Sequence, residues 1–217
     1  MTGDAGPCDG WQRTVTVALT GASGAQYGLR LAECLIESEV RVFLLISQAA
    51  QIVLKLELGL EIPGQAAAAE TWFRERLGAK PGQLRVFGRQ QWTAPVASGS
   101  NPPDAMVICP CTTGTLASVA AGLSEDLIDR AADVALKEGR KLILVVRETP
   151  LTAIHLENML RLARAGVVIM PACPGFYFKP TRIDEIVDFV VARVLDHLAV
   201  PHRLLGRWGE DTSRAIP

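Results

Sequence analysis

Glycines and small polar residues form a turn near the start of the chain, where they could bind an anion. Residues 20–28 read TGASGAQYG and follow an apolar run, TVTVAL. Glycines at a strand-to-helix turn let backbone N–H groups approach an anion, and the helix N-terminus adds its dipole. The turn lacks both the Lys-Ser/Thr ending of a Walker A loop and the GxGxxG spacing of a dinucleotide site. A mononucleotide site and simple tight packing are therefore equally good interpretations.

A second polar turn follows a later apolar run and could bind the same kind of ligand. Residues 109–118 read CPCTTGTLAS, in which Thr112, Thr113 and Thr115 bring hydroxyl and N–H groups to a helix start. Ordinary N-capping by threonine is the alternative explanation. Two such turns at successive strand ends favour one shared phosphate site.

Charged and aromatic residues also follow predicted strands, which is where α/β proteins place catalytic groups. Arg147 and Glu148 come directly after LILVV, and Tyr177 lies in PGFYFKP after VVIM. Arg130 and Lys137 are seven residues apart, so they share one face of a predicted helix. A solvated helix face is the simpler explanation for those two.

Metal and redox chemistry find little support in the sequence. The three histidines have no metal-ligand spacing and are interpreted as structural: His155, His197 and His202. The cysteines are scattered, with no CxxC pair: Cys8, Cys34, Cys109, Cys111 and Cys173. Free cysteines are usually small core residues, so Cys109 and Cys111 are expected in the core.

Composition limits the class of protein. The 217 residues suit one domain, with 49% hydrophobic and 21% charged residues and a mean hydropathy of +0.22. A net charge of -1 gives no nucleic-acid or membrane-surface signature. The longest gently apolar stretch, 167–178, has 12 residues, whereas a membrane span needs about 20. The N-terminus does not resemble a signal peptide, so a cytoplasmic protein is expected.

Strands and helices alternate along the chain. β-branched apolar runs predict buried parallel strands at 14–20, 40–46, 105–109, 141–146 and 167–170. Apolar spacing predicts helices at 26–37, 48–58, 113–121, 127–138 and 152–165, and a last one whose apolar stripe runs from Ile183 to Val194. This alternation predicts a doubly wound α/β fold with ligands at the carboxyl ends of the strands.

Segment boundaries follow from the same pattern. Thr181 and Asp184 are expected to form the capping box of the last helix. Residues 60–104 interrupt the alternation and are interpreted as an insertion with a loop near the site. We expect a polar leader at 1–13, an α/β domain at 14–199, and a tail at 200–217 that contributes to the active site.

Several motifs together resemble a known family. In order along the chain, from about Val15 to Glu210, they are TGASGAQYGLRL, SQAA, CPCTTGTLAS, DRAADVALKE, LVVRETPL, HLENMLRLA, PGFYFKP and RWGE. They resemble the flavin prenyltransferases, the UbiX-like family. The resemblance implies a Rossmann-like, three-layer fold of the flavoprotein type, and a homo-oligomer that is a dodecamer with active sites where subunits meet.

The resemblance also implies the reaction. Reduced FMN would accept a dimethylallyl group from dimethylallyl monophosphate at N5 and C6, and the prenylated FMN would serve a UbiD-type decarboxylase. No metal is expected, and the sequence lacks the DDxxD motif of diphosphate prenyltransferases. Fixed cations and N–H donors would then stabilise the leaving phosphate.

Site residues can be carried over where this sequence matches the family's motifs. The FMN contacts would be Gly21, Ala22, Ser23, Ser47, Thr112, Thr113, Gly114, Thr115 and Arg130. The donor contacts would be Trp92, Lys137, Arg147, Glu148, Tyr177 and Arg193. The catalytic residues would be Ser23, Glu57, Glu148, Tyr177 and Trp208.

Two groups of these residues have an implied role. Ser23 and Glu57 match the family's proton-handling pair near the flavin N5. Trp92, Tyr177 and Trp208 match an aromatic lining, where each ring could stabilise an allylic cation by about 0.5–2 kcal/mol. The family often has serine at position 112, and the threonine found here keeps the hydroxyl.

The sequence alone leaves two alternative functions to consider. A flavin-dependent cysteine decarboxylase of the phosphopantothenoylcysteine type shares the fold, but it needs an early active-site histidine and a PxMN motif. Here no histidine precedes His155, and the third core strand leads into CPCTTGT. A non-catalytic FMN carrier would keep the polar turns but would not need Glu57, Lys137, Arg193 and the aromatic residues together.

Overall fold

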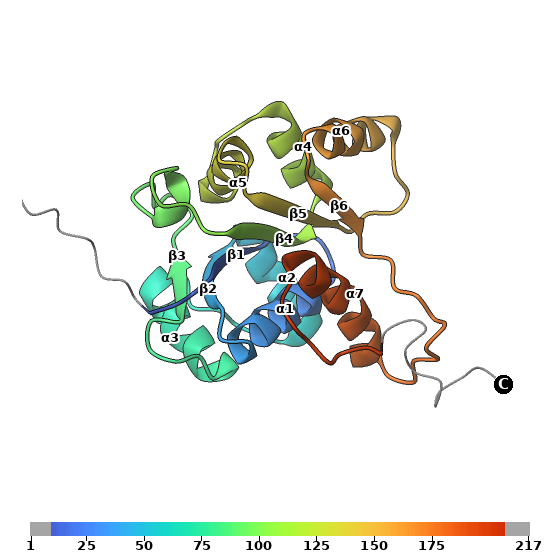
Figure 1. Cartoon of the computed structure of the whole chain (residues 1–217), viewed down its shortest axis with the longest axis horizontal. Coiled ribbons are helices and arrows are strands. Elements are labelled where there is room, and N and C mark those ends of the chain that lie inside the picture. Colours follow the sequence, from blue (N-terminus) through green and yellow to red (C-terminus); the bar gives the residue numbers. More distant parts are fainter. Residues whose placement is uncertain (1–9, 207–217) are drawn as a thin grey trace, which may run out of the picture.

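The computed structural model describes residues 10–206, which form one parallel sheet covered by helices on both faces (Figure 1). The strands are β1 (Thr14–Leu19), β2 (Arg41–Ile46), β3 (Leu84–Phe87), β4 (Ala105–Cys111), β5 (Lys141–Val146) and β6 (Val168–Pro171). The helices are α1 (Ala25–Glu37), α2 (Gln48–Leu58), α3 (Ala66–Leu77), α4 (Thr113–Ala121), α5 (Leu127–Lys137), α6 (Ala153–Arg164) and α7 (Ile183–Leu198), with a 3₁₀ turn η1 (Pro95–Ala97).

The strands are apolar on both sides because both faces of the sheet are covered. One core lies against α1, α2, α3 and α7 and contains Leu35, Leu54 and Phe73. The other lies against α4, α5 and α6 and contains Leu116 and Leu127. Figure 1 shows these helix layers on opposite sides of the sheet. The predicted three-layer, doubly wound fold is confirmed.

The strand order β3-β2-β1-β4-β5-β6 reverses direction between β1 and β4. At such a switch point the connections leave in opposite directions and open a crevice at the carboxyl ends of the strands. We call this side of the sheet the carboxyl edge and the opposite side the amino edge. The two polar turns found in the sequence follow β1 and β4, so both lie at the switch point.

Residues 60–104 do not form the insertion that was expected. They contain α3 and the edge strand β3, which pairs in parallel with β2 through Val42 and Leu84. This unit extends the sheet by the same strand–helix–strand rule as the rest of the fold. The prediction was wrong because β3 has only four residues, one of them the exposed Arg85, and α3 begins with a run of alanines.

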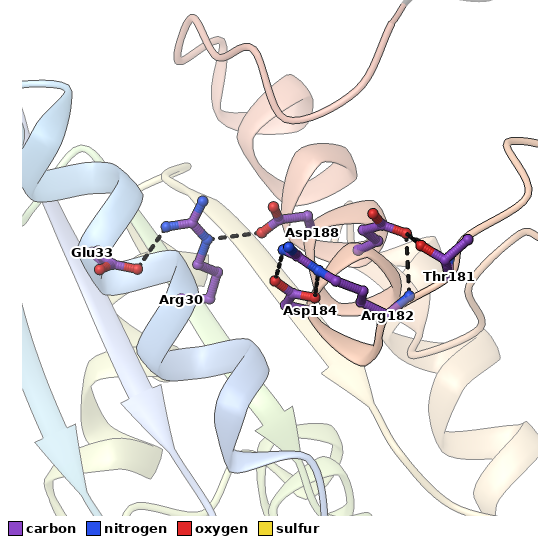
Figure 2. Close-up of polar contacts among 7 residues, drawn as sticks. Arg30, Glu33, Thr181, Arg182, Asp184 and Asp188 are labelled. Carbon is purple, nitrogen blue, oxygen red and sulfur yellow. Dashed lines mark hydrogen bonds and ion pairs between the residues drawn. The ribbon is translucent and has the colours of Figure 1, made fainter.

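The expected capping box of α7 was also wrong. The carboxylate of Glu185, not that of Asp184, accepts hydrogen bonds from the backbone N–H groups of Thr181 (2.6 Å) and Arg182 (3.3 Å). Asp184 instead pairs with the guanidinium of Arg182 (Figure 2). The helix begins at Ile183, so Glu185 has the capping-box position, three residues after Arg182.

Helix α7 is joined to α1 by an ion pair. Arg30 on α1 contacts Asp188 on α7 through Nε (2.7 Å) and Glu33 through Nη1 (2.6 Å), as Figure 2 shows. The hydrogen bond to Asp188 is the main cause that raises the pKa of Arg30. No helix within residues 10–206 is long and apolar enough to cross a membrane.

Candidate functional site

The turn after β1 brings backbone N–H groups to the carboxyl edge. Gly21 lies against the start of α2, because a Cβ atom built on it would be only 2.4 Å from the Cβ of Ala49. Gly24 has a φ of 100°, a conformation that favours glycine, and directly precedes α1. Between them, Ser23 is exposed at the N-terminus of α1, where the helix dipole favours negative charge.

A carboxylate from a different helix occupies this N-terminus. Glu57, near the end of α2, accepts hydrogen bonds from the N–H groups of Gly24 (2.9 Å) and Ala25 (3.0 Å). Partial burial opposes its ionisation, but hydrogen bonds from Ser23, Gly24 and Ala25 and the charge of Arg147 outweigh this and lower the pKa of Glu57. The structure therefore brings Ser23 and Glu57 together with Glu57 ionised at neutral pH.

Ser47 lies where β2 ends, next to the turn after β1. Its N–H group donates to the carbonyl of Leu19 (3.0 Å), which fixes it against β1. Its hydroxyl accepts from the N–H group of Ala50 (3.0 Å) and caps α2. One residue thus helps to fix the α2 start near the β1 turn.

The turn after β4 is built in the same way. The hydroxyl of Thr112 accepts from the N–H group of Thr115 (3.0 Å) and caps α4, and the two side-chain hydroxyls are 2.9 Å apart. The N-capping explanation is thus correct, and it leaves the exposed Gly114 and the half-buried Thr113 at a helix N-terminus on the carboxyl edge. Capping and ligand binding are compatible there.

Arg147 and Glu148 continue the site along the edge, directly after β5. The N–H group of Arg147 donates to the carbonyl of Cys111 (3.2 Å), which holds β5 against the β4 turn. The Nε of Arg147 is buried and has no hydrogen-bond partner in the structure. Glu148 is exposed, and its carboxylate is 3.5 Å from the hydroxyl of Thr113.

These residues fit a flavin phosphate and an anionic substrate. The N-termini of α1, α2 and α4 converge at the switch point. A guanidinium with an unpaired buried N–H lies on the same edge and would be satisfied by an anionic oxygen. Within residues 10–206 no group of three His, Cys, Asp or Glu residues is placed to hold a metal ion.

The expected aromatic lining is only partly described. Tyr177 lies in the segment between β6 and α7, is 53% exposed, and contacts the rings of Phe178 and Phe189 at centroid distances of 5.9 and 5.8 Å. Trp92 follows β3 and is 46% exposed. Trp208 lies outside the described residues.

Two expected donor contacts lie at the opposite edge of the sheet. Lys137 ends α5, four residues before β5 starts at Lys141, so it belongs to the amino edge. Lys141 donates to the carbonyl of His197 (2.6 Å), which places the end of α7, and with it Arg193, near the same edge. Within one chain, the structure does not bring Lys137 or Arg193 together with Ser23.

Three of the cationic side chains expected to bind FMN or the donor contact nearby groups of their own chain. Lys137 pairs with Glu138 at 2.5 Å, and Arg193 pairs with Asp196 at 2.7 Å. Arg130 donates through Nε to the carbonyl of Ala97 (3.0 Å) and pairs with Asp133 (2.8 Å), which holds its guanidinium beside η1.

Burial of the cysteines follows the sequence-based expectation. Cys109 and Cys111 are fully buried, and burial raises the pKa of both thiols. Cys34 is buried as well, and burial raises the pKa of its thiol to about 12. A site residue that sequence analysis missed is Thr20, whose hydroxyl bridges the two polar turns.

One groove is separate from this set of residues. It has a volume of about 600 Å³, lies between α1, α3 and α7, and is lined by none of the residues expected to bind FMN or the donor. The exposed residues of the candidate site instead follow strands at the carboxyl edge of the sheet: Ser23, Gly114, Glu148 and Tyr177.

The fold and the polar turns at its switch point define an α/β flavoprotein, and the family model described as Flavoprotein matches residues 8–195. The flavin prenyltransferase UbiX of Pseudomonas aeruginosa is 56% identical over 196 residues, covering 90% of this chain and 94% of the relative. The chain belongs to the UbiX flavin prenyltransferase family.

Solved structures of UbiX proteins are also similar to this chain. A crystal structure of AnUbiX in complex with FMN and dimethylallyl pyrophosphate has a TM-score of 0.81 and 39% identity, covering 91% of this chain and 97% of that chain. A dodecameric FMN-dependent UbiX-like decarboxylase from Escherichia coli O157:H7 has a TM-score of 0.79 and 41% identity, covering 90% and 98%.

The cysteine decarboxylase alternative is not favoured. A PPC decarboxylase structure has a TM-score of 0.53 and only 16% identity, which shows a shared fold and nothing more. The turn after β4 is also CPCTTGT rather than the PxMN motif expected for such a decarboxylase.

Proposed function

We propose that this protein binds reduced FMN at the carboxyl edge and transfers a dimethylallyl group to it from dimethylallyl phosphate. The observation that carries the proposal is the placement of Ser23 and the ionised Glu57 at the N-terminus of α1, close enough to Arg147 for its charge to lower the pKa of Glu57. When bound, reduced FMN supplies the N5 and C6 atoms that the dimethylallyl group joins. A non-catalytic carrier has no need for this arrangement.

The turns after β1, β2 and β4 would hold the flavin. Backbone N–H groups at Gly21–Ser23 and at Thr113 and Gly114 would face phosphate oxygens, and Ser47 offers a hydroxyl. The N-terminal ends of α1, α2 and α4 add partial positive charge at the same edge. A contact between Arg130 and FMN stays a prediction. In the structure the guanidinium of Arg130 binds the carbonyl of Ala97 and the carboxylate of Asp133 instead.

Ser23 and Glu57 would manage a proton near the reacting atoms. The ionised carboxylate of Glu57 accepts a hydrogen bond from Ser23, so the serine oxygen can accept a proton while its own passes to Glu57. Ser23 is exposed toward the carboxyl edge, where the acceptor would lie.

Arg147 would bind the donor phosphate as the bond between carbon and phosphate oxygen breaks and the phosphate leaves with the electron pair. A fixed guanidinium stabilises this developing charge without reorganisation. Tyr177 and Trp92 are exposed enough for their rings to contact the dimethylallyl group, and Glu148 lies beside Arg147. A monophosphate donor stays a prediction, since AnUbiX was solved with the pyrophosphate.

Assembly is part of the proposal. Because Lys137 and Arg193 lie at the amino edge, they can reach a donor at the carboxyl edge only from another copy of the chain. The dodecameric relative supports an oligomer. Delivery of the product to a UbiD-type decarboxylase and a cytoplasmic location stay predictions of this proposal.

The decisive experiment is mass spectrometry of flavin extracted after anaerobic incubation. The protein, reduced FMN and dimethylallyl monophosphate should give FMN heavier by one C5 unit, and parallel samples should use the pyrophosphate, no donor, or oxidised FMN. Unmodified FMN with both donors would refute the transferase proposal. Product from the pyrophosphate alone would correct the donor.

A further inference from the structure

Thr20 connects the two turns that would hold the flavin. It directly follows β1, it is 3% exposed, and it begins the TGASGAQYG turn without being one of the predicted FMN contacts. Its hydroxyl donates to the carbonyl of Pro110 (2.7 Å) and accepts from the N–H group of Thr112 (2.9 Å). Both partners are about 90 residues away, Pro110 near the end of β4 and Thr112 directly after it.

The Thr20 hydroxyl has one hydrogen to donate, and it donates it to Pro110. It also accepts one hydrogen bond, from Thr112. The backbone N–H of Thr20 also donates to Pro110 (3.3 Å), so that carbonyl would keep one partner without the hydroxyl. For the N–H group of Thr112, the Thr20 hydroxyl is the acceptor that the structure shows. Thr112 is the residue that caps α4 and orients its first turn.

Loss of this hydroxyl would therefore act on geometry at the switch point. A backbone N–H group without an acceptor is unfavourable, so the turn would shift to reach water or another oxygen. Such a shift changes the distance between the N-termini of α1 and α4, which must bind one ligand together. The core below the turn would be little affected, because valine has the shape of threonine.

We propose that Thr20 is a positioning residue for the flavin: its hydroxyl sets the spacing of the β1 and β4 turns and so determines FMN affinity. Thr20 is expected to make no contact with the flavin. The inference rests on the proposed function, since it takes FMN as the ligand of both turns.

The test compares FMN dissociation constants, measured by flavin fluorescence, for the parent protein and three variants. Thr20→Val removes the hydroxyl, and Thr20→Ser keeps it. Thr16→Val is the matched control, because Thr16 is 1% exposed, lies four residues earlier on β1 and pairs in mid-sheet with Phe43 and Met106. Thermal unfolding of each variant without FMN measures damage to the core.

We expect Thr20→Val to weaken FMN binding about tenfold, as the loss of one hydrogen bond to a backbone group would. Thr20→Ser and Thr16→Val should bind as the parent does. Parent-like affinity of Thr20→Val, or equal weakening by Thr16→Val, would overturn the inference while leaving the proposed function intact. If the parent protein itself does not bind FMN, the proposed function is refuted, and the inference that rests on it is refuted too.

Thr20→Ala provides a second route if the valine variant does not fold. The alanine variant should show the same weakened affinity relative to Thr20→Ser. If neither Thr20→Val nor Thr20→Ala unfolds cooperatively while the serine variant does, the hydroxyl serves folding alone and the inference is wrong.

Discussion

Glu57 shows how a single side chain gains chemistry from its surroundings. The residue is exposed near the end of α2, yet the N–H groups of Gly24 and Ala25 and the side chain of Ser23 donate to its carboxylate. Its pKa lies below the ordinary value of 4.5. The stabilising contribution of these bonds is therefore complete above pH 4.5 and is lost as the pH falls through the lower pKa of the folded state.

Glu57→Gln should bind FMN and donor but yield little or no prenylated flavin. The amide keeps the shape of the side chain and loses the group that takes the proton, which typically contributes 10²–10⁴-fold to rate. Extracted flavin can be quantified by mass spectrometry. Glu61→Gln is the control, because Glu61 pairs with Lys55 on the surface. Normal turnover in Glu57→Gln would leave Glu57 as a helix-capping carboxylate without a catalytic role.

Arg147→Ala should impair donor use much more than FMN binding. A charge-assisted hydrogen bond to phosphate contributes about 1.5–3 kcal/mol, which corresponds to roughly 10–150-fold in kcat/KM for the donor. Donor titrations at saturating FMN and a separate FMN titration distinguish the two effects. Arg161→Ala, an exposed residue of α6, controls for charge removal. Equal loss of both ligands would mean that Arg147 is structural.

At the scale of elements, helix caps and sheet order place the functional groups. Ser47 caps α2 and Thr112 caps α4, so each also fixes a helix N-terminus at the switch point. Residues 60–104 contribute α3 and β3 to the same layered fold. This segment is part of the domain's core rather than an appendage.

Phe73→Ala tests this role of α3. Phe73 is fully buried in the core that also contains Leu35 and Leu54. Removing a buried phenylalanine side chain typically costs about 3–5 kcal/mol of folding free energy. Urea denaturation of the apoprotein measures the change, with the exposed Thr71→Ala on the same helix as control. A loss below 1 kcal/mol would indicate that α3 is a loosely attached insertion.

At the scale of the whole molecule, one chain separates residues that the reaction would use together. Ser23 and Arg147 lie at the carboxyl edge, and Lys137 and Arg193 lie near the amino edge. Helices that connect parallel strands run back from one edge to the other, so the end of a helix and the end of its preceding strand are far apart. Under the proposed function, Lys137 and Arg193 would come from a second copy of the chain.

Mixing two inactive variants tests whether copies share a site. Ser23→Ala and Lys137→Ala chains would be dissociated, combined and reassembled, and prenylated flavin would be measured. Recovery is expected because some pockets then combine an intact Ser23 from one chain with an intact Lys137 from another. Each variant reassembled alone is the control. No recovery in proven mixed oligomers would refute sharing for this pair, and a monomer in light scattering would refute it for the protein.

The sequence by itself determined most of the local structure. Apolar periodicity located five of the six strands and placed α2 and α4 at 48–58 and 113–121, because these patterns depend on neighbours within a few residues. Glycine and threonine at strand ends identified the polar turns for the same reason, and the ordered motifs indicated the family that the comparisons confirm. The cap at Glu185 and the short strand β3 escaped because their local signals are weak.

Only the tertiary structure decided which of these residues meet. Glu57 reaches Gly24 across 33 residues, and Thr20 reaches Pro110 and Thr112 across about 90. Such pairs depend on strand order and on the side of the sheet where each connection runs, which local spacing does not encode. The same geometry assigned Lys137 to the edge opposite Ser23, since α5 ends where β5 is about to begin.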